Sequence, residues 1–557
     1  MELIDSRRLT GPNLVWDHPG ALLEVAFRPE NAAVVERWKA EVLALLDAVG
    51  LPKLNTAVKS RHGGAWLVIG GPIDQLYALT ELNELAWSRA SGTPTEEDIT
   101  TDSLRENLRA EANPPLIALQ QAALENNVSF LWDEDAVSLG MGVGSKTWLI
   151  ADLPDSSTLA WTTFSDIPVA VITGTNGKST NVRLLGHMAK CAGRMFGTTS
   201  TDWIRVGDDV LDSGDYSGPG GARTLLRDER VEIAFLETAR GGLLRRGTGV
   251  NRADVALITN VAEDHMGQYG IQTVRDLVEA KMVVSRLVKD GGVLVLNADD
   301  PPLVAYSTLL ENTRLCWFSR DAKNPVVLSH LEAGGTAYFE QEDAIIQMKS
   351  GVRTEIASIP AIPLTLRGLA SYNISNCLSA TAVALELGIP LAAVQQGLVS
   401  FESTPDSNPG RSNYFAVRDF TVLLDYAHNV HSLTAILETT AKLNANRRIL
   451  TLSTAGDRTE HEIREMARIA AESGVEEILI TDCVGYEREL GKGGVPRILL
   501  DELRRHGKLS KSFESEFEGV KEAFRLAKAG DLLILLVKAE RVETLQLIQQ
   551  TNDGVSI

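Results

Sequence analysis

The clearest chemical signal in the sequence is a short glycine-containing turn between an apolar strand and a helix. It consists of Gly174, Thr175, Asn176, Gly177, Lys178, Ser179 and Thr180, directly after the apolar run at 169–173. Glycines let backbone N–H groups turn toward phosphate oxygens, and the start of a helix adds partial positive charge. Lys178 would then reach the outer phosphates of ATP, while the hydroxyl of Ser179 or Thr180 would bind Mg²⁺. Because Ile172 stands where the usual GxxxxGK[ST] pattern has its first glycine, a purely structural turn is the alternative.

Three further side chains could take part in a catalytic site, although each alone has an ordinary structural explanation. Glu237 ends an apolar strand, His265 lies in the segment ITNVAEDHMGQYG, and Lys281 follows it sixteen residues later. A glutamate at a strand end is usually solvated, a single histidine is usually structural, and a helical lysine usually lies at the surface. The segment HNVH at 428–431 could also suggest a metal pair, but a structural role is the more common one. The case for a site therefore depends on the order of these positions along the chain.

That order resembles the Mur ligase family. The turn TGTNGKST at 173–180 has the short form found in the family, and the resemblance continues at ETARGG (237–242), TNVAEDH (259–265), EAKMVV (279–284), GLASYNISN (368–376), PGR (409–411) and DYAHN (425–429), with a weaker match at GDR (456–458). The departures are Tyr372, where the family usually has His, and Val430, where Pro usually follows DYAHN. Neither departure removes a group that the family uses in catalysis.

The resemblance implies a role for each matching residue. The implied catalytic residues are Lys178, Glu237, His265 and Lys281, and the implied metal ligands are Ser179, Glu237, His265 and Lys281, with Lys281 as a carbamate. ATP would be bound by the turn residues 174–180, by Asn373 and Asn376 at the adenine, by Arg411 at the phosphates and by Asp425 at the ribose. Since a hard Mg²⁺ prefers oxygen ligands, a carbamate would convert the lysine into a suitable one.

Within that family, the chain resembles the ligase half of the cyanophycin synthetases. The segments that carry this resemblance are TTSTDW (198–203), GDYSGPGGA (214–222), ETARGGLLRRG (237–247) and SRRLTGPNLVW (6–16). Residues 117–147 resemble the opening of the ATP-grasp module of those enzymes, but only about thirty residues separate Gly144 from Gly174. That length is too short for a second nucleotide site, so the chain resembles a relative that lacks one of the two catalytic modules.

The implied activity is ATP-dependent, ADP-forming amide bond formation between an amino acid and a carboxylate of an amino-acid or peptide acceptor. The carboxylate would take the γ-phosphate to form an acyl phosphate, and an amine would then displace phosphate. Candidate acceptor-binding residues are Thr199, Ser200, Asp215, Ser217, Arg240 and Arg245. The arginines could hold a second, non-reacting carboxylate, although on an acidic protein each could equally pair with a surface acid. The amine would be selected near 482–492, where Glu487 and Glu489 would suit a basic amino acid such as arginine.

The elements that must position these residues predict an α/β fold with three domains. We expect a small α+β domain at 1–160, similar to the N-terminal domain of cyanophycin synthetases with an ATP-grasp remnant, a central P-loop domain with a mostly parallel sheet at 161–408, and a Rossmann-like α/β domain at 409–557. Strands at 168–173, 233–237, 254–259 and 293–296 alternate with helical stretches, which favours a parallel sheet. The polar stretch 88–113 predicts a linker, and 325–365 predicts a small antiparallel addition.

The composition limits the classes of partner that we expect this protein to bind. The net charge of −20 argues against a nucleic-acid partner, because an acidic surface repels phosphate backbones. The four cysteines form no CxxC pair, and no apolar run is long enough for a bilayer, so we expect a cytoplasmic protein without a membrane partner. A homo-oligomer is compatible with the sequence. A catalytically retired ATP-binding scaffold and a P-loop NTPase or kinase are the alternatives to a ligase, and amine-dependent release of ADP would separate the three.

Overall fold

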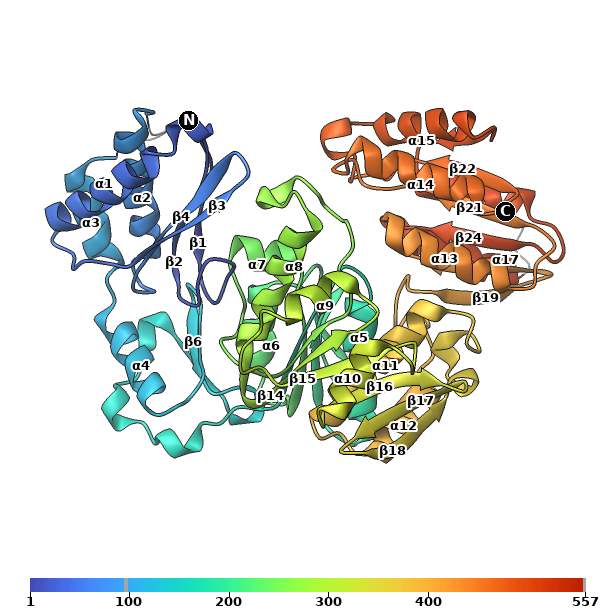
Figure 1. Cartoon of the computed structure of the whole chain (residues 1–557), viewed down its shortest axis with the longest axis horizontal. Helices are drawn as coiled ribbons and strands as arrows, with labels where there is room; N and C mark the ends of the chain where they lie inside the picture. Colours follow the sequence, from blue (N-terminus) through green and yellow to red (C-terminus); the bar gives the residue numbers. More distant parts are fainter. Residues whose placement is uncertain (95–98, 554–557) are drawn as a thin grey trace.

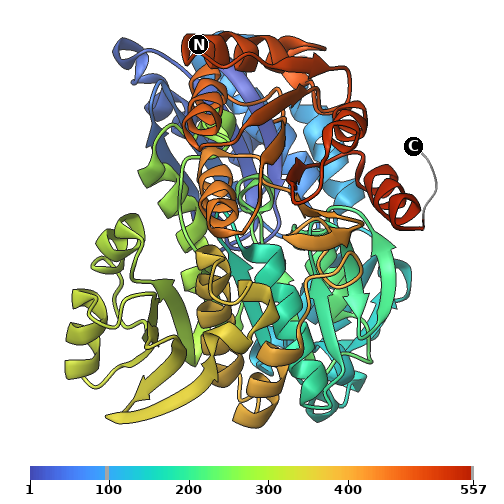
Figure 2. The ribbon, with the colours of Figure 1, turned by 90° about the vertical axis from the view of Figure 1, so that its right-hand side faces the viewer.

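The computed structural model describes residues 1–94 and 99–553, and its four sheets confirm the predicted α/β fold class (Figure 1). Small sheets form the N-terminal part, a mostly parallel sheet forms the centre, and an α/β unit forms the C-terminal part. Figure 2 shows the C-terminal part seated over the central part. Among the described residues, no helix is both long and apolar enough to cross a bilayer.

The first sheet is antiparallel and has the strand order β1-β2-β4-β3. Its strands are β1 (Glu2–Leu9), β2 (Gly20–Ala26), β3 (Thr56–Arg61) and β4 (Gly64–Gly70), and its helices are α1 (Val34–Val49), α2 (Leu76–Ser91) and α3 (Thr101–Glu111). Because side chains alternate along a strand, Leu23 and Leu67 face α1 and α2, whereas Leu22, Trp66 and Val68 pack into the hydrophobic core of the central part. Both faces of this sheet are therefore buried.

The linker predicted at 88–113 is wrong for most of its length, because α2 extends through Ser91 and α3 begins at Thr101. Helix α3 buries only Leu104 and Leu108, so it lacks the broad apolar stripe that identifies a helix in a sequence. A capping box between Thr100 and Ser103 stabilises its start. Part of the segment SGTPTEED, residues 95–98, lies outside the described residues.

A small second unit connects this sheet to the central part. It consists of α4 (Pro114–Glu125) and the antiparallel strands β5 (Phe130–Trp132), β6 (Ala136–Leu139) and β7 (Lys146–Leu149). Leu119 and Val137 are buried in its core, and Leu131 and Met141 join the core of the central part. Three short 3₁₀ turns between Ile150 and Thr163 then lead to the central sheet.

The central sheet has eleven strands in the order β11-β10-β9-β12-β8-β13-β14-β15-β16-β17-β18. They are β8 (Val169–Thr173), β9 (Phe196–Thr199), β10 (Trp203–Val206), β11 (Asp209–Ser213), β12 (Ile233–Glu237), β13 (Ala253–Ile258), β14 (Val288–Asn297), β15 (Leu315–Ser319), β16 (Thr336–Gln341), β17 (Ala344–Lys349) and β18 (Val352–Ser358). Pairing is parallel from β9 through β16 and antiparallel at both edges. The predicted antiparallel addition is therefore β16–β18, which extends this same sheet.

Helices cover both faces of the central sheet and bury its apolar residues. They are α5 (Lys178–Cys191), α6 (Pro219–Leu226), α7 (Arg240–Arg245), α8 (Val274–Met282), α9 (Pro301–Ser307), α10 (Pro325–Glu332), α11 (Ser371–Glu386) and α12 (Leu391–Ser400). Along β8, Val169 and Val171 belong to one hydrophobic core, whereas Ala170 and Ile172 belong to the other. A strand that is buried on both faces explains the continuous apolar run in the sequence.

The C-terminal sheet has six strands in the order β19-β20-β24-β21-β22-β23, and only the β19–β20 pair is antiparallel. Its strands are β19 (Asn413–Val417), β20 (Phe420–Asp425), β21 (Arg448–Leu452), β22 (Glu477–Thr481), β23 (Lys511–Phe513) and β24 (Leu532–Leu536), and its helices are α13 (Val430–Lys442), α14 (Glu460–Glu472), α15 (Gly494–Arg505), α16 (Glu516–Leu526) and α17 (Arg541–Asn552). The carboxyl end of β20 faces the central part, which brings Asp425 to the cavity described next.

Candidate active site

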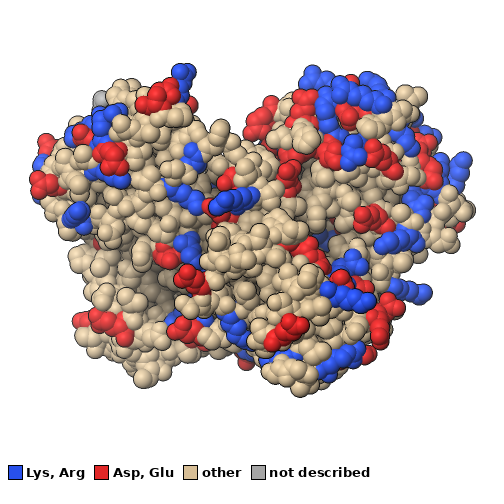
Figure 3. All heavy atoms as spheres, viewed as in Figure 1, with Lys and Arg blue, Asp and Glu red and all other residues tan. Residues whose placement is uncertain are grey.

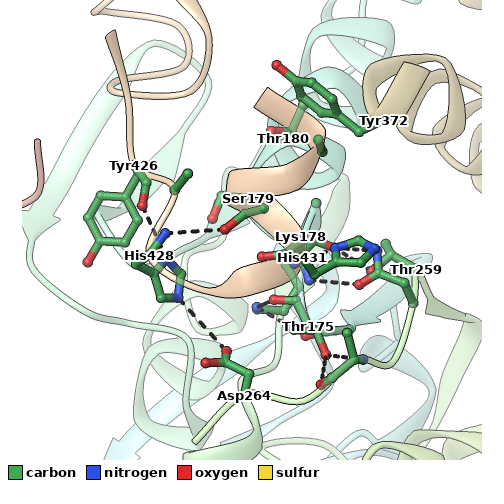
Figure 4. Close-up of a pocket in the computed structure, with 18 of the residues that line it drawn as sticks. Thr175, Lys178, Ser179, Thr180, Thr259, Asp264, Tyr372, Tyr426, His428 and His431 are labelled. Carbon is green, nitrogen blue, oxygen red and sulfur yellow. Dashed lines mark hydrogen bonds and ion pairs between the residues drawn. The ribbon is translucent and has the colours of Figure 1, made fainter. Parts of the chain in front are cut away.

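A cavity of about 1570 Å³ lies where the carboxyl ends of the central strands meet the C-terminal part. In open α/β sheets this edge is where ligands bind. Side chains from both parts point into the cavity, with Lys178 and Ser179 on one side and Tyr426 and His428 on the other (Figure 4). The predicted site residues are thus brought together by strand ends that lie far apart in the sequence.

The turn at 174–177 is held in shape by the end of β13. The carbonyl of Asn260 accepts from the N–H of Thr175, and the Oδ1 of Asn260 accepts from the N–H of Asn176, each at 2.9 Å. A Cβ atom on Gly174 would lie 1.8 Å from the Oγ1 of Thr259, so only glycine fits there. Lys178 donates from Nζ to the carbonyls of Gly174 and Thr175 at 3.1 and 3.0 Å, at the centre of the turn. The backbone is therefore preformed for an anion.

Glu237 is a buried carboxylate whose oxygens accept no hydrogen bond from the described residues. It lies at the end of β12 with 2% of its surface exposed, and both carboxylate oxygens lack a hydrogen bond. Burial raises the pKa of Glu237, and the charge of Lys178 opposes that shift. Burying a carboxylate without a partner costs free energy, and a bound cation would offset that cost. Oxygen ligands suit a hard divalent cation. Together with the hydroxyl of Ser179 in the same cavity, Glu237 therefore fits a metal ligand.

Lys281 is another buried charge without a direct partner. Its side chain lines the cavity from α8 with 4% of its surface exposed, and it makes no hydrogen bond or ion pair with any described residue. Burial lowers the pKa of Lys281 to about 7, and repulsion from Lys178 contributes to the shift. Desolvation disfavours the charged form of an amine. A substantial fraction of Lys281 is therefore neutral near pH 7.

His265 lies at the junction of the central and C-terminal parts, in a left-handed backbone conformation with a φ of 54°. Burial lowers its pKa to about 4, so the ring is neutral near pH 7. The guanidinium of Arg458 lies 2.8 Å from Nδ1 of His265 and forms an ion pair with Asp264 at 3.2 Å. Across the same junction, Nε2 of His428 lies 3.9 Å from Asp264 (Figure 4). Arg458 must therefore move away before a metal ion can reach the ring of His265.

The predicted nucleotide-binding residues surround the other end of the cavity. Asn376 lines it and accepts from Asn181, a buried residue of α5 that also bonds to the carbonyl of Gly177. Asn373 is bonded to Asn376 at 3.0 Å. The helix α11 that carries both asparagines is thus fixed directly against the turn at 174–177.

The C-terminal wall of that end is formed by the segments around Arg411 and Asp425. The guanidinium of Arg411 stacks over the ring of Tyr426 at 4.3 Å, and both residues line the cavity. Asp425 accepts from the backbone of Ser412, whose hydroxyl also contacts Tyr372. Tyr372, the departure from the family pattern, therefore takes part in the contact between the two parts.

The structure brings only some of the predicted acceptor-binding residues to the cavity. Asp215, Ser217 and Arg240 line it. Thr199 and Ser200 are fully buried at the end of β9, and Arg245 is exposed, so these three lie outside the lining formed by the described residues. From the predicted amine-selecting segment, Arg488 lines the cavity. Glu487 and Glu489 are not among the described residues that line it.

Two charged residues that join the central and C-terminal parts were underrated in the sequence. Arg458 belongs to the weakly matching GDR segment, yet it is 6% exposed and touches His265 and Asp264 of the central part. Asp202 pairs with Arg183 of α5 and with Arg541 of α17, the latter at 2.7 Å. The only sequence signal for these residues is a charged side chain within or beside a motif, because ion pairs over such separations leave no periodic pattern.

Comparison with known proteins agrees with this geometry. Residues 172–384 match the family model of the Mur ligase middle domain, and residues 410–538 match that of the Mur ligase glutamate ligase domain. These two matches include more than half of the chain, which belongs to the Mur ligase family. Among curated proteins it is similar to the cyanophycin synthetase of Geminocystis herdmanii, with 37% identity over 55% of this chain and 35% of that protein. For the cyanophycin synthetase of a Nostoc strain the identity is 32% over 70% of this chain and 44% of that protein.

The chain therefore spans less than half the length of these curated relatives. Among solved structures, it shares its fold with Escherichia coli FolC in complex with DHPP and ADP, at a TM-score of 0.53 and 20% identity over 69% of this chain and 88% of FolC. The predicted membership of the Mur ligase family and the similarity to cyanophycin synthetases are confirmed.

Proposed function

We propose that this protein is an ATP-dependent, ADP-forming ligase that joins an amino acid to a carboxylate of an amino-acid or peptide acceptor. The observation that carries the proposal is the position of Glu237, an unpartnered buried carboxylate in the same cavity as Lys178 of the phosphate-binding turn. A nucleotide site with a metal-binding carboxylate suits phosphoryl transfer, in which negative charge must be neutralised. Membership of the Mur ligase family and the ADP in the FolC complex support the proposal.

In this mechanism the residues of the chain bind and orient the reactants. Lys178 and the N–H groups of the turn bind the phosphates of ATP, Arg411 approaches them from the C-terminal part, and the asparagines of α11 lie on the adenine side. Ser179, Glu237, His265 and carbamylated Lys281 would hold Mg²⁺, which would supply positive charge to offset the negative charge of the reacting groups. The acceptor carboxylate attacks the γ-phosphorus and ADP leaves. The amine then attacks the acyl carbon, and phosphate leaves as a proton is released.

Substrate selection is proposed from the cavity walls. Arg240 lines the acceptor side, where its guanidinium suits a second carboxylate of an aspartyl- or glutamyl-type acceptor. On the C-terminal side Glu438 and Glu465 line the cavity, and acids there would suit a basic amino acid such as arginine. Arg488 on the same wall would suit the α-carboxylate of the incoming amino acid.

The test is a matrix of carboxylate acceptors and amino acids, scored by ADP release and product mass. We expect ADP release to depend on a specific acceptor and amine, and to be lost on chelation of the metal ion. Lys178→Ala should abolish it with an unchanged circular dichroism spectrum, whereas Lys190→Ala, an exposed lysine on the same helix paired with Asp208, should not. If no pair raises ADP release above the ATP-only rate, the ligase proposal fails. Amine-independent turnover would then favour an NTPase, and ATP binding without turnover a scaffold.

A further inference from the structure

The loop from His265 to Ile271 lies between the cavity and the N-terminal sheet. On one side, His265, Gln268 and Tyr269 line the cavity. On the other side, Met266, Tyr269 and Ile271 pack in the same hydrophobic core as Leu9, Leu22 and Trp66 of the N-terminal sheet. Two of its residues, His265 and Tyr269, have a left-handed φ of 54° and 50°, a conformation that is unfavourable for residues other than glycine. The loop therefore needs external contacts to keep this conformation.

Arginines of the N-terminal sheet supply such contacts. The guanidinium of Arg7 lies 5.9 Å from the ring centroid of Tyr269, and that of Arg240 from the central part lies at the same distance. Arg240 in turn donates to the carbonyl of His265 at 3.1 Å. A cation near an aromatic ring is attracted by the ring quadrupole, most strongly where water is excluded. Arg7 is thus connected through Tyr269 and Arg240 to the backbone of His265.

Arg61 makes the second contact, at Gly270. This glycine has a φ of 73°, and a Cβ atom on it would lie 1.9 Å from Nη1 of Arg61. Arg7 and Arg61 both pair with the buried Glu24 of β2, at 3.2 and 2.5 Å. The guanidinium of Arg61 therefore cannot move aside without leaving Glu24.

The remaining acceptor-side elements are also attached to the N-terminal sheet. Nε of Arg7 donates to the carbonyl of Leu244 at the end of α7, and the N–H of Thr10 donates to the carbonyl of Arg246. Lys59 of β3 pairs at 2.8 Å with Glu279, two residues before Lys281 on α8. The N-terminal sheet thus contacts each of the three elements that carry Arg240, His265 and Lys281.

We propose that the N-terminal sheet is a brace that fixes the loop His265–Ile271 in its working conformation, with Arg7 and Arg61 as positioning residues. The functional part of this inference rests on the proposed ligase activity, because the brace would set the position of His265 and Arg240 toward metal and acceptor. ATP binding, which depends on the turn at 174–180, should be independent of it.

The experiment combines hydrogen–deuterium exchange of the loop with kinetics of the full chain. Arg7→Gln and Gly270→Ala should each raise exchange in peptides covering 264–271 at least tenfold and lower kcat at least tenfold, with the KM for ATP and the exchange of α5 unchanged. Arg7→Lys retains the cation and should restore most of both. Arg37→Gln is the matched control, because the side chain of Arg37 on α1 donates to the carbonyl of Ala90, away from the loop. If Arg7→Gln does not fold, Tyr269→Leu removes the same contact from the side of the loop.

Unchanged exchange in the loop of folded Arg7→Gln or Tyr269→Leu would overturn the brace. So would increased exchange with an unchanged kcat, or an equal effect of Arg37→Gln. Because exchange is measured without turnover, failure of the ligase proposal is recognised separately, by the absence of activity in the unsubstituted chain.

Discussion

Among the side chains that line the cavity, Lys281 gives the sharpest test of the proposed activity. Its pKa is lowered to about 7 by burial and by the charge of Lys178, so the neutral amine forms about a tenth of the population at pH 6 and about nine tenths at pH 8. Only a neutral amine can add CO₂ to give the carbamate that we propose as a metal ligand. Activity should therefore rise with pH through this range, since deprotonation generates the reactive form.

The expected result is an increase of about tenfold in ADP release between pH 6 and pH 8, with stimulation by bicarbonate in CO₂-depleted buffer. Lys281→Ala should be nearly inactive and partly restored by acetate, whereas Lys323→Ala, an exposed lysine, should behave normally. A flat pH profile together with substantial activity of Lys281→Ala would contradict the assignment. Steady-state rates over the pH range provide the measurement.

At the scale of single residues, the sequence predicted several side chains that line the cavity. Lys178, Glu237, His265 and Lys281 were predicted from the resemblance to the Mur ligase family, and all four line it. Their roles stay predictions. Thr199, Ser200 and Arg245 were proposed because they lie in segments that resemble cyanophycin synthetases, but membership of a motif does not determine which way a side chain points. Arg458 was underrated because its partners lie almost two hundred residues away in the chain.

Among the elements, α5 of the central part and α17 of the C-terminal part are linked through Asp202, which pairs with an arginine of each. Burial alone would raise the pKa of Asp202, but Arg183 and its neighbours lower it to about 2, so it is ionised at neutral pH. Its two oxygens face Arg183 and Arg541 from the two parts. A charge-assisted hydrogen bond of this kind contributes about 1.5–3 kcal/mol.

Arg541→Ala should therefore weaken closure of the C-terminal part and raise the KM for ATP about tenfold, because the cavity needs its C-terminal wall. The radius of gyration from X-ray scattering should increase, while the melting temperature changes little. Arg525→Ala, an exposed arginine that pairs with Glu522 within α16, is the control. Unchanged scattering and an unchanged KM would show that this ion pair does not hold the parts together.

The elements themselves were predictable to different degrees. The strands β8, β12 and β13 are largely apolar because both faces are buried, and a run of that kind is visible in the sequence. Helix α3 was missed because it buries only two leucines, so its pattern resembles that of a loop. The continuity of β16–β18 with the parallel sheet was not predictable, since strand pairing over a long range leaves no local pattern.

For the whole molecule, the short span between the N-terminal unit and the turn at 174–180 limits the number of reactions that we expect the chain to catalyse. Between Gly144 and Gly174 the structure has β7, three 3₁₀ turns and the start of the central sheet. That span provides no second nucleotide site among the described residues, in contrast to the two catalytic modules implied for cyanophycin synthetases. We therefore expect the purified chain to form one type of linkage only.

With ATP, aspartate, arginine and a short peptide primer, mass spectrometry should detect a single amide or isopeptide, or a homopolymer with one repeated bond. An alternating aspartate–arginine polymer made by the chain alone would refute this expectation. Acidic and basic side chains are interspersed over the face shown in Figure 3. The predicted domain boundaries and a homo-oligomer stay predictions.

Because both faces of the N-terminal sheet are buried, the gene that encodes this chain cannot be divided freely between its N-terminal and central regions. Leu9, Leu22, Trp66 and Val68 belong to the same hydrophobic core as Val169 and Val171 of the central sheet. A recombination event that separated the two coding regions would leave apolar surface exposed on both products, and such surfaces promote aggregation. Selection should then keep the two regions together even when material between them is gained or lost. The N-terminal sheet and the ligase core are accordingly expected to be inherited as one unit.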